Sequence, residues 1–207
     1  KLELKADAAV GYFGAAILFV AFIFDAPSKA PDILLLSIAL FIIATLITQT
    51  FRFQVDFSKM LTGIGATLLG VFYVVFLGGY LISIRTGFDV FLSTKLLGFF
   101  FLVIMGADAG AYFSGKFLGK HKLAPKISPN KTVEGLVGGI VASLAFATLA
   151  HYWFFPELSL KFSLPLAGVM AIISVLGDLA ESAMKRGSDT KDAANILPGH
   201  GGLLDRL

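Results

Sequence analysis

Two segments of this chain carry most of the side chains that could do chemistry. One covers residues 106–135 and the other residues 177–207, and together they hold two of the three histidines and the acids that fall inside apolar runs. An acid inside an apolar run is costly unless it faces water, a cation or a basic partner. The two segments therefore predict a site that handles charged groups.

The second segment opens with acids spaced along a predicted helix. Asp178 and Glu181 are three residues apart and so share one helix face, which Lys185 continues one turn later. Asp108 lies in another apolar run. These acids indicate either a structural ion pair between helices or a cation or substrate site. Carboxylate oxygens, in a chain without cysteine, favour Mg²⁺ over zinc.

The first segment contains a basic stretch, residues 116–132, that mixes lysines with hydroxyl and amide side chains around two prolines. Its lysines are Lys116, Lys120, Lys122, Lys126 and Lys131. Ser128 and Thr132 add hydroxyl donors, and a helix predicted to begin near Thr132 would offer free N–H groups to an anion. Ser128 or Asn130 could cap that helix, with Glu134 in its first turn. The stretch predicts either a phosphate cradle or a solvated loop that touches anionic lipid headgroups.

The run Pro198–Arg206 is rich in glycine and carries three functional side chains, His200, Asp205 and Arg206. Glycines beside a histidine allow the backbone to approach a ligand closely. We expect His200 to contact a phosphate or donate a proton, although a turn at the membrane surface would also explain the glycines.

The elements that must position these residues are membrane helices. Hydrophobic residues make up 57% of the chain and charged residues 15%, whereas soluble domains have about 45–50% and about 25%. Six continuous apolar runs approach the roughly 20 residues that cross a bilayer. They are about Ala8–Phe24, Ile33–Thr50, Met60–Ile84, Leu96–Phe113, Val133–Phe155 and Leu164–Met184. The sequence predicts an all-α polytopic membrane bundle, with residues 1–207 forming one transmembrane catalytic domain.

The basic residues also predict an orientation. If each run crosses the bilayer once, 13 of the 17 lysines and arginines lie on one side, which the positive-inside rule places in the cytoplasm. Both chemistry-bearing segments lie on that side. The net charge of +3 points to no particular partner, and we expect no nucleic acid to bind.

The second segment resembles the signature of the phosphatidate cytidylyltransferases, also called CDP-diacylglycerol synthases. The resemblance is carried by Ser182-Ala-Met-Lys-Arg and, four residues later, by Lys191-Asp-Ala-Ala-Asn-Ile-Leu-Pro-Gly-His-Gly-Gly-Leu-Leu-Asp-Arg-Leu. Upstream, Asp108-Ala-Gly-Ala-Tyr and Lys122-Leu-Ala-Pro-Lys-Ile-Ser-Pro-Asn-Lys-Thr-Val-Glu-Gly are also similar to this family. Members of the family are usually longer, so the full-length protein is expected to contain further helices.

The resemblance implies a reaction and a set of roles. CTP and phosphatidic acid would give CDP-diacylglycerol and pyrophosphate, with Mg²⁺ and an added monovalent cation such as K⁺, in a homodimer at the cytoplasmic face of the inner membrane. It implies metal-binding aspartates at Asp178 and Asp205, and a substrate-binding lysine at Lys126. Other expected site residues are Asp108, Ser128, Lys131, Thr132, Glu181, Lys185, Arg186, Lys191, His200 and Arg206.

Two other functions fit parts of the pattern. A CTP-dependent kinase of a lipid alcohol would transfer the γ-phosphoryl group and release CDP. A secondary transporter would also place acids within spans, although it predicts inverted repeats and a site at the midplane. The chain shows no repeat and its polar residues gather toward one face. Cytidylyl transfer is therefore the preferred interpretation.

Overall fold

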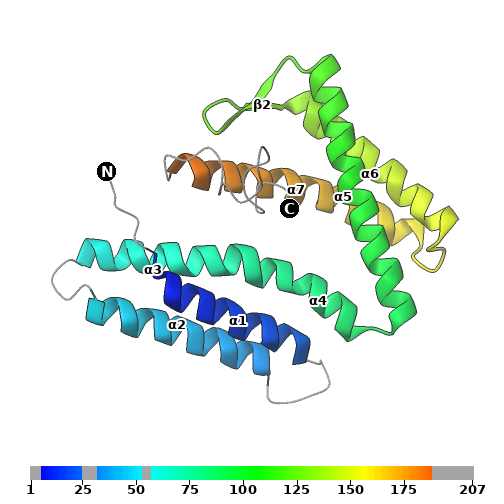
Figure 1. Cartoon of the computed structure of the whole chain (residues 1–207). Coiled ribbons are helices and arrows are strands. Elements are labelled where there is room, and N and C mark those ends of the chain that lie inside the picture. The colour runs from blue at the N-terminus through cyan, green and yellow to red at the C-terminus, as the bar shows by residue number, and fades with distance from the viewer. Residues whose placement is uncertain (1–5, 25–31, 53–56, 188–207) are drawn as a thin grey trace, which may run out of the picture. The chain divides into compact units, whose positions relative to one another are not determined.

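The computed structural model describes residues 6–24, 32–52 and 57–187, and the chain in these ranges is almost entirely helical (Figure 1). The elements in chain order are α1 (Ala8–Phe24), α2 (Ile33–Arg52), α3 (Phe57–Val71), the π-helix η1 (Phe72–Phe76), α4 (Leu77–Gly87), α5 (Val90–Leu118), β1 (Lys122–Ala124), β2 (Ser128–Thr132), α6 (Val133–Trp153) and α7 (Leu160–Gly187).

The prediction of a polytopic helical membrane protein is confirmed. Within the described ranges, five helical segments are long and apolar enough to span a membrane, and α1 is a shorter apolar helix. One of the five is the run of α3, η1 and α4, residues 57–87. The large side chains that these helices expose are apolar, as expected where the surrounding solvent is lipid.

Two helices and one local structure differ most from the sequence-based expectation. Helix α5 begins at Val90 rather than near Leu96 and continues to Leu118 rather than ending near Phe113, because Lys116 is a good helix former and favours the negative end of a helix. Helix α7 extends from Leu160 to Gly187, beyond the predicted 164–184. The basic stretch is not only a loop: residues 122–132 form an antiparallel hairpin.

The chain divides into two compact units, residues 1–97 and 98–207. Each unit is described separately below, and the expectation of a single catalytic domain stays a prediction.

The first unit packs α1 against α2, α3, η1 and α4 around a mixed aliphatic and aromatic core. Leu18, Phe41 and Val71 form its buried centre. The ring of Phe22 packs against those of Phe76 and Tyr80, with centroids 6.0 and 5.6 Å away. These contacts join α1 to η1 and α4.

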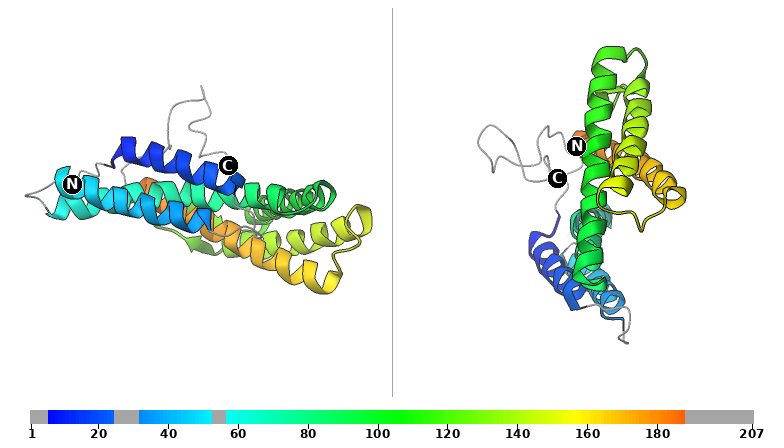
Figure 2. Two further views of the ribbon diagram at one scale, coloured as in Figure 1. Left: turned by 90° about the horizontal axis from the view of Figure 1, so that it is seen from below. Right: turned by 90° about the vertical axis from the view of Figure 1, so that its right-hand side faces the viewer.

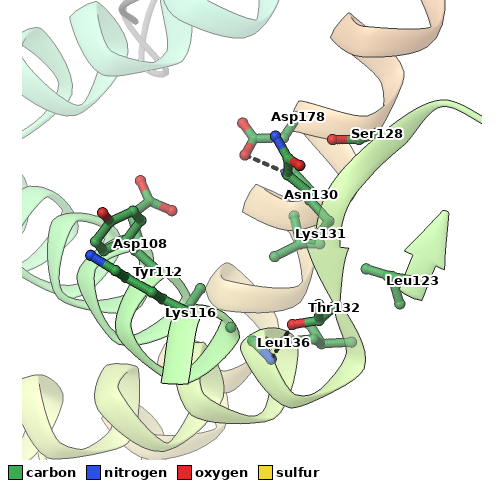
Figure 3. A pocket seen from close by; sticks show the side chains of 14 residues that line it. Asp108, Tyr112, Lys116, Leu123, Ser128, Asn130, Lys131, Thr132, Leu136 and Asp178 are labelled. Carbon is green, nitrogen blue, oxygen red and sulfur yellow. Dashed lines mark hydrogen bonds and ion pairs between the residues drawn. The ribbon is translucent and has the colours of Figure 1, made fainter. Parts of the chain in front are cut away.

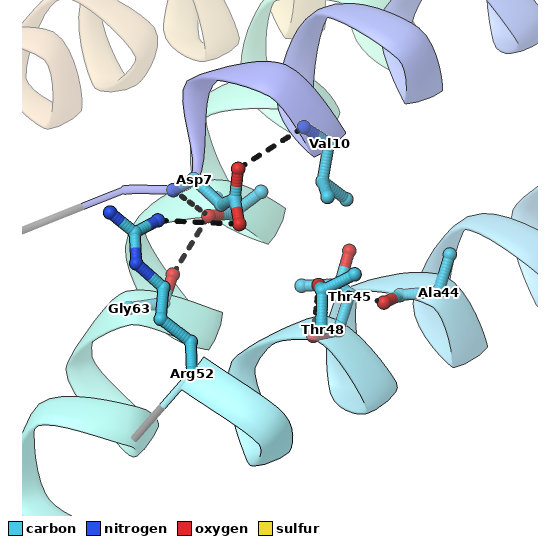
Figure 4. Close-up of polar contacts among 8 residues, drawn as sticks. Asp7, Val10, Ala44, Thr45, Thr48, Arg52 and Gly63 are labelled. Carbon is cyan, nitrogen blue, oxygen red and sulfur yellow. Dashed lines mark hydrogen bonds and ion pairs between the residues drawn. The ribbon is translucent and has the colours of Figure 1, made fainter.

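Several polar groups of the first unit bond within the helix bundle. The hydroxyl of Thr45 donates to the carbonyl of Phe41 at 2.8 Å, and the hydroxyl of Thr67 accepts from the backbone N–H of Asp7 at 2.9 Å. The carboxylate of Asp7 caps α1 and pairs with Arg52 of α2 at 3.3 Å (Figure 4). Bonds of this kind, within one helix and between helices, let polar side chains remain inside an apolar helix bundle.

In the second unit, α5 and α6 run alongside each other in near backbone contact (Figure 2). A Cβ added at Gly110 would lie 2.4 Å from the Cβ of Ala142 and 2.8 Å from the carbonyl oxygen of Gly138. A Cβ added at Gly139 would lie 3.1 Å from the carbonyl oxygen of Ala107. Small residues four apart on both helices permit this approach, which is a common device in membrane bundles.

Helix α7 completes the second unit by packing along α6. Its buried residues Ser163, Ala167 and Ala171 recur every four residues, so they form one narrow face. Because that face is made of small side chains, α7 can lie close to its neighbour. This arrangement determines where the polar end of α7 lies relative to α6 and the hairpin.

The contact between α5 and α6 predicts a position-specific cost for large side chains. Gly110→Leu should force the two backbones apart and lower the melting temperature by roughly 3–10 °C, since overpacking costs about 1–3 kcal/mol. Loss of helical circular dichroism on heating the detergent-solubilised protein measures this.

Gly65→Leu on α3 is the matched control, because a Cβ there meets nothing within 4 Å. An equal drop in melting temperature for both variants would show that the α5–α6 contact has no special role.

Candidate functional site

A cavity of about 520 Å³ lies in the second unit, where α5, the hairpin, α6 and α7 meet (Figure 3). It is lined by Asp108, Ala111, Tyr112, Gly115, Lys116, Leu123, Ser128, Asn130, Lys131, Thr132, Gly135, Leu136, Val175 and Asp178. The polar lining contains two carboxylates and two ammonium groups. The cavity therefore offers side chains of opposite charge to both anionic and cationic groups of a ligand.

Helix α5 contributes one polar face to this cavity. Asp108, Tyr112 and Lys116 are four residues apart, so they lie above one another along the helix. The Lys116 ammonium lies 5.7 Å from the centroid of the Tyr112 ring, within the range of a cation–π contact. Because Ala111 and Gly115 beside this face are small, α5 leaves open space in front of it.

The β2 strand places several consecutive polar residues at the cavity: Ser128, Asn130, Lys131 and Thr132. Thr132 ends the strand and caps α6, because its hydroxyl oxygen accepts from the backbone N–H of Gly135 at 3.1 Å. The expectation that Ser128 or Asn130 caps this helix is therefore wrong. The strand extends to the residue before the helix, which makes Thr132 the last non-helical position.

Lys131 and Asp178 form the central ion pair of the cavity. The Lys131 ammonium donates to a carboxylate oxygen of Asp178 at 2.5 Å, joining the hairpin to α7. The Lys131 side chain is 24% exposed and that of Asp178 is 55% exposed. The carboxylate therefore remains open to solvent on the side away from the lysine.

The acids of α7 have different partners. Glu181 pairs with Lys185 one turn later at 3.0 Å, as expected from their spacing. Asp178 pairs with Lys131 of the hairpin and not with a basic residue of its own helix. The ion pair at Asp178 joins strand β2 to helix α7, so it is not the pair between helices that the sequence also allowed. The expectation of a cation or substrate site at these acids stays a prediction.

The structure brings together five of the predicted site residues at one cavity: Asp108, Ser128, Lys131, Thr132 and Asp178. Lys126 lies exposed in the hairpin turn, and Glu181, Lys185 and Arg186 lie on the last turns of α7. The remaining predicted residues, Lys191, His200, Asp205 and Arg206, lie outside the described ranges. Their roles stay predictions.

Three polar lining residues were given no individual role in the predicted site: Tyr112, Lys116 and Asn130, of which Lys116 was named only within the basic stretch. A signal for two of them was present in the sequence. Tyr112 lies four residues after Asp108 in the predicted helix, and extending that helix by one turn would have placed Lys116 on the same face as the acid. Asn130 had no such signal, because its position depends on the strand.

The oxygen donors of the cavity suit a hard cation such as Mg²⁺. Asp108 and Asp178 supply carboxylates, and Ser128 and Asn130 add neutral oxygens. Within residues 6–24, 32–52 and 57–187, however, no group of three or more acids or histidines could hold a metal ion. The expectation of a Mg²⁺ site therefore stays a prediction.

Comparison with known proteins gives a consistent result along nearly the whole chain. The family model described as "Cytidylyltransferase family" matches residues 3–207. A protein of Bacillus subtilis named phosphatidate cytidylyltransferase is 39% identical over 210 residues, which cover 99% of this chain and 76% of the relative.

Shorter matches point the same way. Proteins of Staphylococcus haemolyticus and Haemophilus influenzae, both named phosphatidate cytidylyltransferase, are 43% and 44% identical over 58% of this chain. These matches span 48% and 43% of the two relatives.

The contact between Lys131 and Asp178 predicts efficient cross-linking between these positions. Because the chain has no cysteine of its own, Lys131→Cys combined with Asp178→Cys gives a single reactive pair. A short thiol-specific cross-linker should join the two, which proteolysis and mass spectrometry of the linked peptides would detect.

Lys131→Cys combined with Glu157→Cys is the control. Glu157 follows the far end of the 21-residue helix α6, about 30 Å along the helix axis from the hairpin. Equal yields from the two pairs would contradict the arrangement of the cavity.

Proposed function

This chain belongs to the cytidylyltransferase family, and on that premise we propose that it transfers the cytidylyl group of CTP to phosphatidic acid. The products are CDP-diacylglycerol and pyrophosphate. The observation that supports this most directly is the cavity in which a lysine and a carboxylate, Lys131 and Asp178, lie within 2.5 Å of each other. Such a cavity offers one group for phosphate and one for a cation.

The reaction needs charge neutralisation more than a protein nucleophile. A phosphate oxygen of the lipid attacks the α-phosphorus of CTP, and the bond from that phosphorus to the bridging oxygen of the β-phosphate breaks. Both reactants are anions, so positioning and electrostatic stabilisation account for most of the catalysis. The site must therefore hold two anions close together while it keeps water out.

The proposed metal ligands are Asp178 and Asp205, with Mg²⁺ as the principal ion and a second, monovalent ion such as K⁺. When bound, Mg²⁺ supplies positive charge to the phosphates and to the departing pyrophosphate. The half-exposed carboxylate of Asp178 is accessible to such an ion. Asp108, across the cavity on α5, adds a further carboxylate to the same space.

The proposed phosphate ligands are on the hairpin and the end of α5. Lys131 now donates to Asp178, and its ammonium group becomes available to a phosphate oxygen once Asp178 takes another partner. Ser128 and Asn130 can donate from their side chains, and Lys116 adds positive charge from the opposite wall. The hairpin would thus bind the triphosphate of CTP.

Lys126 in the hairpin turn is assigned to substrate binding on the family resemblance. Further residues are proposed for the site from their charge or hydrogen-bonding groups: Thr132 at the helix cap, Glu181, Lys185 and Arg186 on α7, and Lys191, His200 and Arg206. The basic members would hold phosphates, and His200 would contact a phosphate or donate a proton.

The membrane determines how the lipid substrate reaches the site. We infer that the site faces the cytoplasm across a bacterial inner membrane, since CTP is a cytoplasmic nucleotide and the basic residues gather on that side. Phosphatidic acid would enter sideways between helices, because withdrawing an acyl chain costs about 0.8 kcal/mol per CH₂. A homodimer is the proposed assembly.

The activity predicts a radiolabelled lipid product. In mixed phospholipid micelles, the full-length protein with α-³²P-CTP, phosphatidic acid and Mg²⁺ should yield labelled CDP-diacylglycerol in the organic phase. Asp178→Asn and Asp205→Asn should each lower the rate by about 10²–10³-fold, since each removes a charged ligand that acts on the transition state.

Asp89→Asn is the matched control, because Asp89 caps the opposite end of α5 and asparagine caps a helix equally well. Transfer of label from γ-³²P-CTP to a lipid alcohol, without CDP-diacylglycerol, would instead identify a lipid kinase. Absence of any labelled lipid from folded protein would overturn the proposal.

A further inference from the structure

The base of the β1–β2 hairpin is closed by one carboxylate, that of Glu134 in the first turn of α6. Its oxygens accept from the backbone N–H of Lys120 at 3.1 Å and from that of His121 at 3.2 and 3.3 Å. The Nδ1 atom of His121 lies 2.6 Å from the same carboxylate. Glu134 thus bonds to the segment that leaves α5.

Two further contacts join the start and the end of the hairpin. The backbone N–H of Val133 donates to the carbonyl of His121 at 2.9 Å. Gly119 allows the chain to turn closely here, since a Cβ at this position would lie 2.9 Å from the Cγ2 of Thr132. The hairpin therefore enters and leaves through one compact junction.

The contacts of Glu134 differ from those of an ordinary acid at a helix N-terminus. Such an acid is usually explained by the free N–H groups and the dipole of its own helix. Here the partners lie 13 and 14 residues earlier in the chain, beyond the end of α5. The Glu134 side chain is 25% exposed, whereas that of His121 is 78% exposed.

We propose that Glu134 is a positioning residue, which holds the hairpin so that its phosphate ligands face the cavity. This rests on the proposed function, in which the hairpin binds the triphosphate of CTP. Two short strands are at best marginally stable by themselves, and β1 and β2 contain only three and five residues. An anchored base lowers the entropy that must be lost when CTP is bound.

The bonds of Glu134 predict a graded series of variants. Glu134→Ala removes every contact of the carboxylate, whereas Glu134→Gln keeps one acceptor oxygen for the backbone N–H groups. His121→Ala removes only the ring contact, and the backbone N–H of residue 121 remains. The effects should therefore be largest for Glu134→Ala, intermediate for Glu134→Gln and smallest for His121→Ala.

A spin label measures hairpin motion without reference to activity. Residues 1–207 contain no cysteine, so Lys126→Cys, with any cysteine elsewhere in the full-length protein replaced by serine, places a single nitroxide in the exposed hairpin turn. Adding Glu134→Ala should sharpen the electron paramagnetic resonance lines, because the turn becomes more mobile. Adding Glu157→Ala, which removes an acid beyond the other end of α6, should leave the lines unchanged.

Steady-state kinetics of the Glu134 variants, without the spin label, then test whether this residue positions the hairpin. Glu134→Ala should raise the KM for CTP about tenfold, by loss of charge-assisted bonds. The KM for phosphatidic acid should stay within about twofold, and the melting temperature close to that of the parent protein. Glu134→Gln should restore part of the affinity for CTP, a rescue that a purely structural role would not produce.

The outcomes separate this inference from the proposed function. Unchanged label mobility in Glu134→Ala would overturn the positioning role even if the parent protein is fully active. Increased mobility with an unchanged KM for CTP, or with a rise only in the KM for phosphatidic acid, would also overturn it. Absence of CDP-diacylglycerol from the parent protein would refute the proposed function, whatever the label shows.

Discussion

The close contact between α5 and α6 is the constraint on which the second unit depends. The two backbones approach so closely at Gly110 and Gly138 that no side chain fits between them. In lipid there is little hydrophobic gain from packing two apolar helices, so association relies on van der Waals contact between small residues. Because the hairpin connects these two helices, their contact determines where the hairpin begins and ends.

The hairpin that connects α5 and α6 supplies polar side chains to the lining of the cavity. Its sequence from Ser128 to Thr132 contains the side chains that face the cavity, while Glu134 and Thr132 close and cap the junction below it. The carboxylate of Glu134 accepts from the backbone N–H groups of Lys120 and His121 at this junction. In our proposal, the same residue therefore closes the hairpin and positions its phosphate ligands.

The ion pair of Lys131 and Asp178 shows how the cavity balances its charges without ligand. Each group offsets the other at 2.5 Å, so neither remains an isolated charge beside apolar helices. In the proposed reaction, Lys131 turns to a phosphate oxygen and Asp178 to a cation, so each keeps a partner of opposite charge. The arrangement suits two anionic substrates that must meet at the edge of the hydrocarbon region.

The sequence by itself determined that the chain lies in lipid and forms helices, and it indicated which residues could bind charged groups. Long apolar runs require helices in lipid, and Asp108 and Asp178 stood out as candidate site residues because an acid inside an apolar run is costly unless it faces water, a cation or a basic partner. Only the tertiary structure decided that Lys131, rather than Lys185, pairs with Asp178, and that Glu134 closes the hairpin. Periodicity reports neighbours on one helix, whereas these contacts join residues on different elements, whose distances follow from how closely the helices pack.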